Sequence, residues 1–398
     1  MTAPGAARLP GLVDRLRGEL VETRRAVHRD PELSNAEHRT AELCARRCEE
    51  LGFTVRTGVG GSTGLIADLD SGRAGRTVMV RADIDALPIT ERGGVRPATS
   101  ANPGVMHACG HDGHIAIALG VGAALAELRA EWSGRLRLCF QPAEEIAGGA
   151  VPMIEDGALL GVDTVLGVHL WSLLQVGEIA VGPGPLFGSA DEFGISVRGR
   201  GGHGGLPHDA VDPVVAAAQL VVALQAVVSR ETSPFSPAVV TIGRIAGGTA
   251  FNVIAEEVAL SGTVRAFERV ERERILQRVS EIATDVARTY RCEADFSRKG
   301  GCPPVVSDAA VATLVRDAAV EALGDEAVRE APRITVGDDV ACFLERVPGC
   351  YYLVGAGDLR RGPVAPHHHP EFDIDERSLA VGLATLSGAA LAALAAPG

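Results

Sequence analysis

The chain has 398 residues, of which 46% are hydrophobic and 22% are charged, and this composition excludes a disordered polypeptide. A formal net charge of −13, without clusters of Lys and Arg, excludes a general nucleic-acid surface. The eight cysteines follow no disulfide spacing and the first residues form no apolar signal region, so we expect a cytoplasmic protein with reduced thiols.

The first half of the chain alternates helical patterns with short apolar runs. Helices are expected near 12–29 and 36–51, and strands at "GLIADL", "TVMVRAD", "RLRLCFQ" and "TVLGVHL". This alternation predicts an α/β fold, a mostly parallel sheet with helices on both faces, and the same pattern resumes after residue 300. We therefore expect a discontinuous domain of residues 1–188 and 301–398. In such sheets ligands bind at the carboxyl ends of the strands.

Residues 189–300 have a different pattern, which reads strand, helix, two strands, helix, strand. This βαββαβ order predicts an inserted ferredoxin-like domain. Near the C-terminus, "SLAVGLATLSGAALAALAA" is the only stretch that we expect could be mistaken for a membrane span. It is rich in Ala and Gly and has no basic flank, so we interpret it as a buried core helix and expect no membrane partner.

The motif "MHACGHDGH" places Cys109 two residues before His111. In an extended segment or a turn, two side chains at this spacing can point to the same side. Thiolate and imidazole are preferred ligands of zinc and other transition metals. The local pattern fits equally a loop that packs Cys109 and solvates the histidines, and Cys109 could also be a nucleophile assisted by a neighbouring histidine.

Two adjacent carboxylates, Glu144 and Glu145, follow the apolar strand "RLRLCFQ". Removing both from water would be costly without a cation beside them. Adjacent carboxylates can also divide their work, one as a ligand and the other as a proton carrier. The alternative is an exposed helix N-terminus, where Glu is favoured by the helix dipole.

Further histidines lie at His169, which we expect at the end of "TVLGVHL", and in the run 367–369. Taken alone, the first could be a core residue and the run could be a surface turn. Together with the two motifs above, however, one chain supplies Cys, His, Glu, His and His at separate strand ends. Packing does not explain that combination, which predicts a metal site.

The order of these motifs resembles that of the metallo-aminoacylase and carboxypeptidase family across nearly the whole chain. The resemblance is strongest to the amidohydrolase branch, which includes hippurate hydrolases, auxin-conjugate hydrolases and N-acetyl-diaminopimelate deacetylases. It implies that residues 189–300 are a lid and dimerisation domain, so we expect a homodimer or a higher homo-oligomer. The segments that carry the resemblance are "RADIDALPI", "SANPGVMHACGHDGH", "QPAEE", "GVHL", "GRGGHGGLPH", "AFNVI" and "HHPEFDIDE".

The resemblance also implies a site for two divalent metal ions, which could be Mn, Zn, Co or Ni. Glu144 would be the general base, and Asp83 in "RADID" would orient the ligands or the base. Some relatives carry a ligating His two residues before that Asp, where this chain has Arg81. The implied metal ligands are Cys109, His111, Glu145, His169 and His368, the last of which stands two residues before a proline.

Three residues of the inserted domain receive roles from the same resemblance. His203 would donate a hydrogen bond to the oxyanion, from its own subunit or from the partner. Asn252 would contact the polar backbone of the substrate. Arg265 would pair with the substrate carboxylate, although a strand-surface ion pair explains it equally well. The remaining histidines of these motifs are expected to be structural: His107, His114 and His208.

The resulting prediction is a metal-dependent amidohydrolase that acts on small N-acyl amino acids. A dipeptidase or carboxypeptidase of the same family is the alternative, and a Cys-nucleophile hydrolase and a non-catalytic binding protein are less favoured. Where many relatives have Ser-Glu-Asp-Phe, this chain has Gly-Asp-Asp-Val at 337–340. Because of this departure, the sequence does not identify the acyl group or the amino acid of the substrate.

Overall fold

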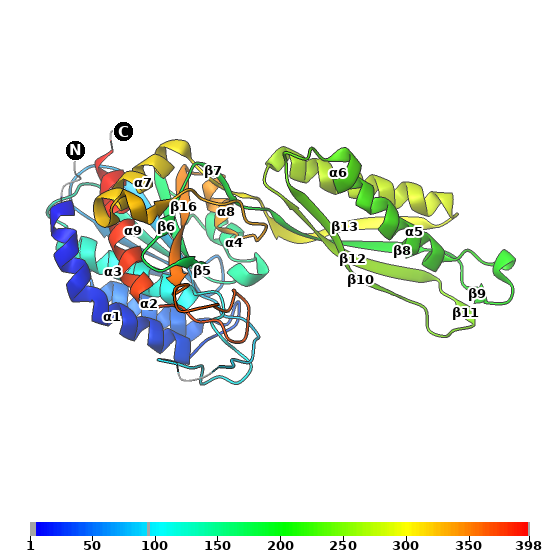
Figure 1. Ribbon diagram of the computed structural model, residues 1–398, viewed down its shortest axis with the longest axis horizontal. Helices are drawn as coiled ribbons and strands as arrows, with labels where there is room; N and C mark the ends of the chain where they lie inside the picture. The colour runs from blue at the N-terminus through cyan, green and yellow to red at the C-terminus, as the bar shows by residue number, and fades with distance from the viewer. Residues whose placement is uncertain (1–4, 94–95, 397–398) are drawn as a thin grey trace. The chain divides into compact units, whose positions relative to one another are not determined.

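The computed structural model describes residues 5–93 and 96–396 (Figure 1). Within them the chain forms two compact units. The large unit comprises the residues up to 186, residues 306–332 and the residues from 339 on, and the small unit comprises residues 187–305 and 333–338. The small unit thus extends beyond the expected 189–300, because Phe187 bridges to Ile334 and the last strand of its sheet continues to Cys302.

The large unit is built on an eight-stranded sheet in the order β1-β2-β4-β3-β5-β16-β6-β15. Its centre, β4-β3-β5-β16, is parallel, whereas β1 and β2 are antiparallel additions at one edge. The predicted mostly parallel sheet is therefore confirmed. The strands are β1 (Thr54–Val59), β2 (Gly64–Asp70), β3 (Thr77–Asp83), β4 (Arg135–Gln141), β5 (Thr164–Gln175), β6 (Ile179–Ala180), β15 (Val328–Arg329) and β16 (Gly349–Gly357).

Helices cover both faces of this sheet because successive strand residues point to opposite sides. In β3, Val78 and Val80 join the core beneath one group of helices, and Met79 joins a second core beneath α4 and α8. Helices α1, α3 and α9 pack against one another in the first group (Figure 1). The helices are α1 (Leu9–Arg29), α2 (His38–Glu50), α3 (His111–Glu127), α4 (Ala150–Glu155), α7 (Ala309–Leu323), α8 (Val340–Leu344) and α9 (Arg377–Ala395).

The small unit has the predicted βαββαβ order and forms a four-stranded antiparallel sheet, β10-β12-β8-β13. Phe193, Ile195 and Val197 of β8 share a core with apolar residues of both helices. A short ribbon pairs β9 (Gly202–His203) with β11 (Val253–Ile254), and β7 (Gly184–Phe187) pairs with β14 (Val305–Ser307). The remaining elements are β8 (Ala190–Arg198), α5 (Pro213–Ala226), β10 (Ala238–Gly247), β12 (Glu257–Ala266), α6 (Arg269–Thr289) and β13 (Glu293–Cys302).

Two helical segments among the described residues are long and apolar enough to cross a membrane by length and composition alone. Helix α9 is one of them, and 67% of it is buried inside the large unit, as expected for a core helix. The expectation that it is the only such stretch is wrong. In the small unit, α5 continues into a π-helical turn, and together they form a second apolar segment, Pro213–Glu231.

Candidate metal centre

Cys109 and His111 lie at the start of α3, near the carboxyl ends of the parallel strands. Gly110 between them has φ 90°, a conformation that L side chains rarely adopt, and it starts the helix at His111. The His111 Nδ1–H donates to the backbone carbonyl of Asp85 at 3.0 Å. The lone pair of its Nε2 therefore points to the other side of the ring.

The His111 Nε2 atom is the electrostatic centre of the site. It is buried and has no hydrogen-bond partner among the described residues. Three carboxylate oxygens lie just beyond hydrogen-bond distance, those of Asp83 at 3.7 Å and of Glu144 and Glu145 at 3.8 Å. Burial lowers the pKa of His111, but the surrounding carboxylates raise it to about 10. Positive charge is thus strongly stabilised at this point.

Glu144 and Glu145 lie on a turn that follows β4. The turn is a single 3-10 element (Glu144–Ile146), and the residues on either side of it, Ala143 and Ala147, have φ of 54° and 49°. Non-glycine residues rarely adopt this left-handed conformation, which costs about 1–2 kcal/mol each. The turn is therefore held in shape by its surroundings, and burial raises the pKa of Glu145.

Two buried carboxylates bind the backbone of this turn. Glu37 accepts the N–H of Ala143 at 2.9 Å, and Asp85 accepts the N–H of Glu145 at 3.1 Å. Asp85 also carries the carbonyl that orients His111. One residue thus fixes a histidine and a glutamate of the site relative to each other.

His169 and His368 approach from two further elements. His169 lies within β5, which runs on to Gln175, so the expectation that the strand ends at this histidine is wrong. Its Nε2 lies 3.7 Å from the Cys109 Sγ. The His368 Nε2 lies 3.3 Å from a Glu145 carboxylate oxygen, and its backbone N–H donates to Ala108 at 2.8 Å.

The structure brings all five predicted ligands together in two overlapping groups. Within each group the donor atoms lie within 4.8 Å of one another, and Cys109 belongs to both. A donor shared between two such groups fits a pair of neighbouring metal ions. The first group is Cys109, His111 and His169, and the second is Cys109, Glu145 and His368.

The three consecutive histidines have three different environments. His367 anchors the run 367–369 to β5, because its Nε2 donates to the Leu170 carbonyl at 2.9 Å and its ring stacks on Trp171. His368 has φ 63° and projects toward Glu145. The Nδ1 of His369 accepts a backbone N–H of the same turn. Residue type alone could not distinguish these roles, and only the family resemblance selected His368, by its position two residues before the proline.

Asp83 and His114 form a support beside the ligands. The His114 Nδ1–H donates to Asp83 at 2.6 Å, and its Nε2 accepts the backbone N–H of Leu170, the residue after His169. Burial raises the pKa of Asp83, but His111, His114 and Arg81 hold it well below its ordinary value. A supporting position fits the prediction for both residues.

A second support beneath "HDGH" was missed by the sequence reasoning. Arg24 of α1 donates to Asp112 at 2.7 Å, and His28, one helical turn further on, contacts the same carboxylate at 2.8 Å. Arg24 falls on the buried stripe of α1, in series with Leu16 and Leu20. A charged residue in an apolar stripe was the available signal.

The predicted residues of the small unit are described within that unit. His203 is exposed on β9, and its Nδ1 accepts the N–H of Gly205 at 3.0 Å. The neighbouring ribbon strand brings Asn252 beside it, since the Gly204 N–H donates to the Asn252 carbonyl at 2.8 Å. Arg265 is half-buried on β12, in the other sheet of the unit. The ribbon therefore unites two of the three predicted residues.

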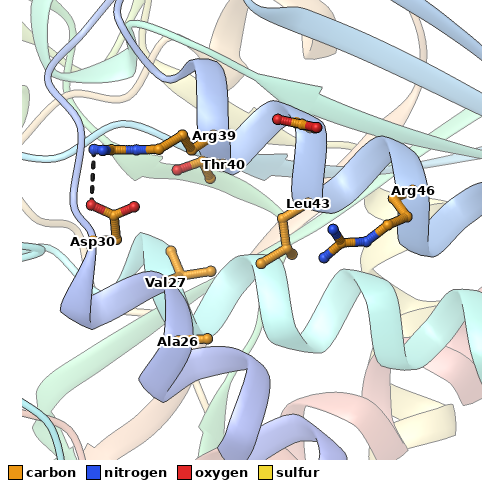
Figure 2. A pocket seen from close by; sticks show the side chains of 8 residues that line it. Ala26, Val27, Asp30, Arg39, Thr40, Leu43 and Arg46 are labelled. Carbon is orange, nitrogen blue, oxygen red and sulfur yellow. Dashed lines mark ion pairs between the residues drawn. The ribbon is translucent and has the colours of Figure 1, made fainter.

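A separate surface pocket lies between α1 and α2 (Figure 2). Val27 and Leu43 form its apolar wall, and the Arg39–Asp30 ion pair, with an N···O distance of 2.8 Å, lies at its rim. Both charged side chains are partly exposed to solvent, and the buried hydroxyl of Thr40, which also lines the pocket, already donates to Glu32 at 3.0 Å. The pocket contributes nothing to the metal centre.

The parallel sheet and this buried set of thiol, imidazole and carboxylate donors define a metal-dependent amidohydrolase. The chain belongs to Peptidase family M20/M25/M40, whose sequence model matches residues 79–392. Among curated relatives it is 40% identical to an N-acetyl-L-cysteine deacetylase of Bacillus subtilis, over 92% of this chain and 85% of the relative. It is 35% identical to thermostable carboxypeptidase 2 of Saccharolobus solfataricus, over 91% and 92%.

Solved structures agree with this assignment. A Bacillus subtilis protein described as a dinuclear metal-binding peptidase of the M20 family superposes with a TM-score of 0.84 at 34% identity. The comparison covers 96% of this chain and 99% of that one.

Proposed function

We propose that this protein hydrolyses the amide bond of N-acyl amino acids and releases a carboxylic acid and an amino acid. The observation that carries the proposal is the His111 Nε2 atom, which is buried, unpaired among the described residues and faced by three carboxylates. A hydrogen bond does not bridge these distances, whereas a cation bound to the Nε2 would be stabilised by the negative charge of the three carboxylates.

The donor set fits two divalent ions. Thiolate, imidazole and carboxylate together suit Zn, Mn, Co or Ni. The backbone carbonyl of Asp85 holds the Nδ1–H of His111, so the Nε2 is the ligating atom. We assign as ligands the residues of the two overlapping groups: Cys109, His111, Glu145, His169 and His368.

When bound, the two ions would polarise the scissile carbonyl and lower the pKa of the attacking water. Glu144 would take the proton of that water and deliver it to the departing amine, a service that contributes about 10²–10⁴-fold. Its neighbour Glu145 shares a candidate ligand group with Cys109 and His368, and we assign the remaining carboxylate of the pair, Glu144, to proton transfer. Asp83 would keep His114 in place through their hydrogen bond and would place negative charge beside His111.

The small unit would supply the polar contacts to the substrate. Because the His203 Nδ1 accepts the Gly205 N–H, its proton resides on Nε2, which makes that atom a hydrogen-bond donor. We assign it to the oxyanion, from the same chain or a second copy. Asn252 would contact the substrate backbone, and Arg265 would pair with its carboxylate.

A homodimer through the small unit is part of the proposal. Helix α5 turns Val214, Val215 and Val222 outward, and their exposed fractions are 46%, 47% and 66%. A second copy would cover this apolar face. Light scattering should report a dimer, and Val215→Glu/Val222→Glu should give a monomer. A wild-type monomer at micromolar concentration would contradict this part of the proposal.

A cytoplasmic location also remains a prediction. Each of the eight cysteines lies in the described part of the chain and is a free thiol, as expected in a reducing compartment.

A carboxypeptidase or dipeptidase activity is the second candidate, favoured by the likeness to thermostable carboxypeptidase 2. A panel of N-acetyl, N-benzoyl and dipeptide substrates distinguishes the two activities. We expect the highest kcat/KM on N-acyl amino acids. Higher values on dipeptides would favour the second candidate.

The central experiment is Glu144→Gln. Metal content, measured by elemental analysis, should stay near two ions per chain while kcat falls about 10²–10⁴-fold. The matched control is Glu155→Gln, which changes an exposed glutamate at the end of α4 and should leave kcat unchanged. Full activity of Glu144→Gln would refute the assigned base.

Chelation tests the metal independently. Removing the ions should abolish activity, and Mn²⁺ or Zn²⁺ should restore it. Activity that survives exhaustive chelation but is lost to iodoacetamide would indicate Cys109 as a nucleophile.

A further inference from the structure

The turn that carries Glu144 and Glu145 is closed at both ends by one buried carboxylate. Asp339, directly before α8, is 2% exposed. Its Oδ1 accepts the side-chain amide N–H of Gln141 at 2.6 Å, and its Oδ2 accepts the backbone N–H groups of Gly149 and Ala150 at 3.3 and 3.0 Å. Gln141 ends β4 and Ala150 begins α4, so Asp339 binds the residue before the turn and the residues after it.

Arg81 fixes the direction of these hydrogen bonds. Its Nε donates to the Gln141 carbonyl oxygen at 2.8 Å, so the amide nitrogen of Gln141 must face Asp339. The same guanidinium donates to Asp339 at 3.3 Å and to Asp83 at 2.6 Å. All four side chains are buried, so their hydrogen bonds are not exchanged for water.

The two ends of the turn are pressed together. A Cβ atom added to Gly149 would lie 1.7 Å from the Pro142 carbonyl oxygen, so only glycine fits at this approach. Between these ends, Ala143 and Ala147 keep their left-handed conformations. A strained segment persists only where its surroundings determine its shape, and Asp339 holds both ends.

We propose that Asp339, oriented by Arg81 and Gln141, is a positioning residue that sets the geometry of Glu144 for proton transfer. The inference rests on the proposed function, because it takes Glu144 as the general base. The three side chains Arg81, Gln141 and Asp339, here called the clamp, act on the base and not on the substrate. They hold the turn, and an Asp339 carboxylate oxygen also lies within 4.8 Å of one of Glu144, so Gln141→Met, which changes no charge, separates the effect of position from that of charge. A displacement of the base by about 1 Å can lower a rate about 10²-fold, so loosening the clamp should lower kcat.

The test is Asp339→Asn. An asparagine retains one acceptor oxygen, so its amide nitrogen must face either the turn N–H groups or the Gln141 amide nitrogen, and donors would meet donors. We expect kcat to fall about 10-fold to 10²-fold, while KM stays within about twofold and metal content stays unchanged. A purely structural role would lower the melting temperature and leave kcat per folded molecule unchanged.

A second substitution reverses the hydrogen bond. In Asp339→Asn/Gln141→Glu, the asparagine amide can donate to the new carboxylate, which also accepts the Arg81 Nε, and the net charge of the clamp equals that of the wild type. Two weaker contacts are lost in the double variant, because the Pro142 carbonyl, which accepts the Gln141 amide at 3.2 Å, would face a carboxylate oxygen, and the Arg81 guanidinium, which donates to Asp339 at 3.3 Å, would face an amide nitrogen. The double variant should therefore recover part of the lost kcat, whereas Gln141→Glu alone sets two carboxylates against each other and should be impaired. Such non-additivity measures direct coupling between the two side chains.

The matched control is Asp68→Asn. Asp68 on β2 pairs with Arg137 of β4 through two hydrogen bonds of 2.7 and 2.8 Å in the same sheet. This variant should lose stability and keep its kcat. If Asp339→Asn does not fold, Gln141→Met removes the same hydrogen bond at similar volume and should show the same fall in kcat.

Three outcomes would overturn the proposal: a wild-type kcat in Asp339→Asn or Gln141→Met, a double variant no better than the single one, or a loss of activity that follows metal content. Glu144→Gln separates these from a failure of the proposed function. If that variant is inactive while the clamp variants retain full kcat, the base is correct and the clamp is wrong. If it is active, the base itself is wrong.

Discussion

Replacing Arg24 with methionine should make the large unit markedly easier to unfold. Methionine keeps the aliphatic stem and removes the guanidinium, which pairs with Asp112 at 2.7 Å and with Asp373 at 2.9 Å. Asp112 would remain buried with His28 as its nearest partner of opposite charge. The substitution therefore leaves the buried Asp112 carboxylate with only one of its two close basic partners.

The size of the effect follows from burial. The side chains of Arg24 and Asp112 are each 1% exposed, and breaking such a pair from one side costs about 3–5 kcal/mol. The Asp373 and Glu376 side chains are 32% and 15% exposed, so their pairs with Arg24 add less. Burial alone would raise the pKa of Asp112, and Arg24 and His28 hold it far below its ordinary value. The charge is therefore present and needs a partner at neutral pH.

Urea denaturation followed by tryptophan fluorescence measures this effect in the large unit alone, because Trp132 and Trp171 both lie there and the chain has no other tryptophan. With an m value of about 3 kcal/mol/M, the midpoint should fall by about 1 M or more. In Arg24→Met/Asp112→Asn the buried charge is removed as well, and part of the loss should be regained. An unchanged midpoint in the single variant would refute the reasoning.

Three smaller perturbations test other parts of the structure. Burial lowers the pKa of His28, but hydrogen bonds to Asp112 and Glu91 raise it above its ordinary value. The stability that protonated His28 contributes to the fold is therefore complete below about pH 6.5 and is lost as pH rises through the folded-state pKa. His28→Gln should flatten that decline in urea titrations from about pH 6 to 9, and an unchanged slope would contradict the assignment. Asp308→Ala removes the side chain that caps α7 and should cost about 1 kcal/mol in the same assay; no loss would argue against the cap. His367→Phe keeps the stack on Trp171 but loses the anchoring hydrogen bond, so metal affinity in a chelator competition should fall about tenfold or more, and wild-type affinity would exclude an anchoring role.

The fold could be predicted because its signals are local. Each central strand is a short apolar run bounded by polar residues, and β3 and β4 are buried from their second residue on. The βαββαβ order of the small unit is also visible in consecutive segments. The prediction failed at the end of β5, where the strand continued past the expected boundary, and for the helix of the small unit, whose span was expected but whose apolar length was not recognised.

The metal site could be predicted from residue chemistry and the candidate ligands from the family resemblance, but the residues that support them could not. The hydrogen bond between Gln141 and Asp339 joins residues 198 positions apart, and the Arg24–Asp112 pair spans 88 positions. No periodicity or motif connects such residues. Their partnership exists only because the sheet brings the carboxyl end of β4 to the start of α8, and α1 to the start of α3.

Arg81 is the clearest case in which the structure answers a question that the sequence raised. At this position some relatives carry a ligating histidine, and the sequence assigned the arginine of this chain no role. Its guanidinium lies between Asp83 and Asp339 and orients Gln141. The position therefore serves the geometry of the site through hydrogen bonds, without contributing a ligand.

The charges of the buried site also explain why an arginine suits position 81. Asp83, Asp85 and Asp339 are each at most 2% exposed, and Glu144 and Glu145 lie beside them. Arg81 alone among these side chains carries a permanent positive charge, and a group of carboxylates held together by one guanidinium would be strongly destabilising. Two divalent ions would supply most of the positive charge that these carboxylates and the Cys109 thiolate require. An arginine at position 81 is thus suited to a site in which the acidic support of the turn, and not only the ligands, must be neutralised.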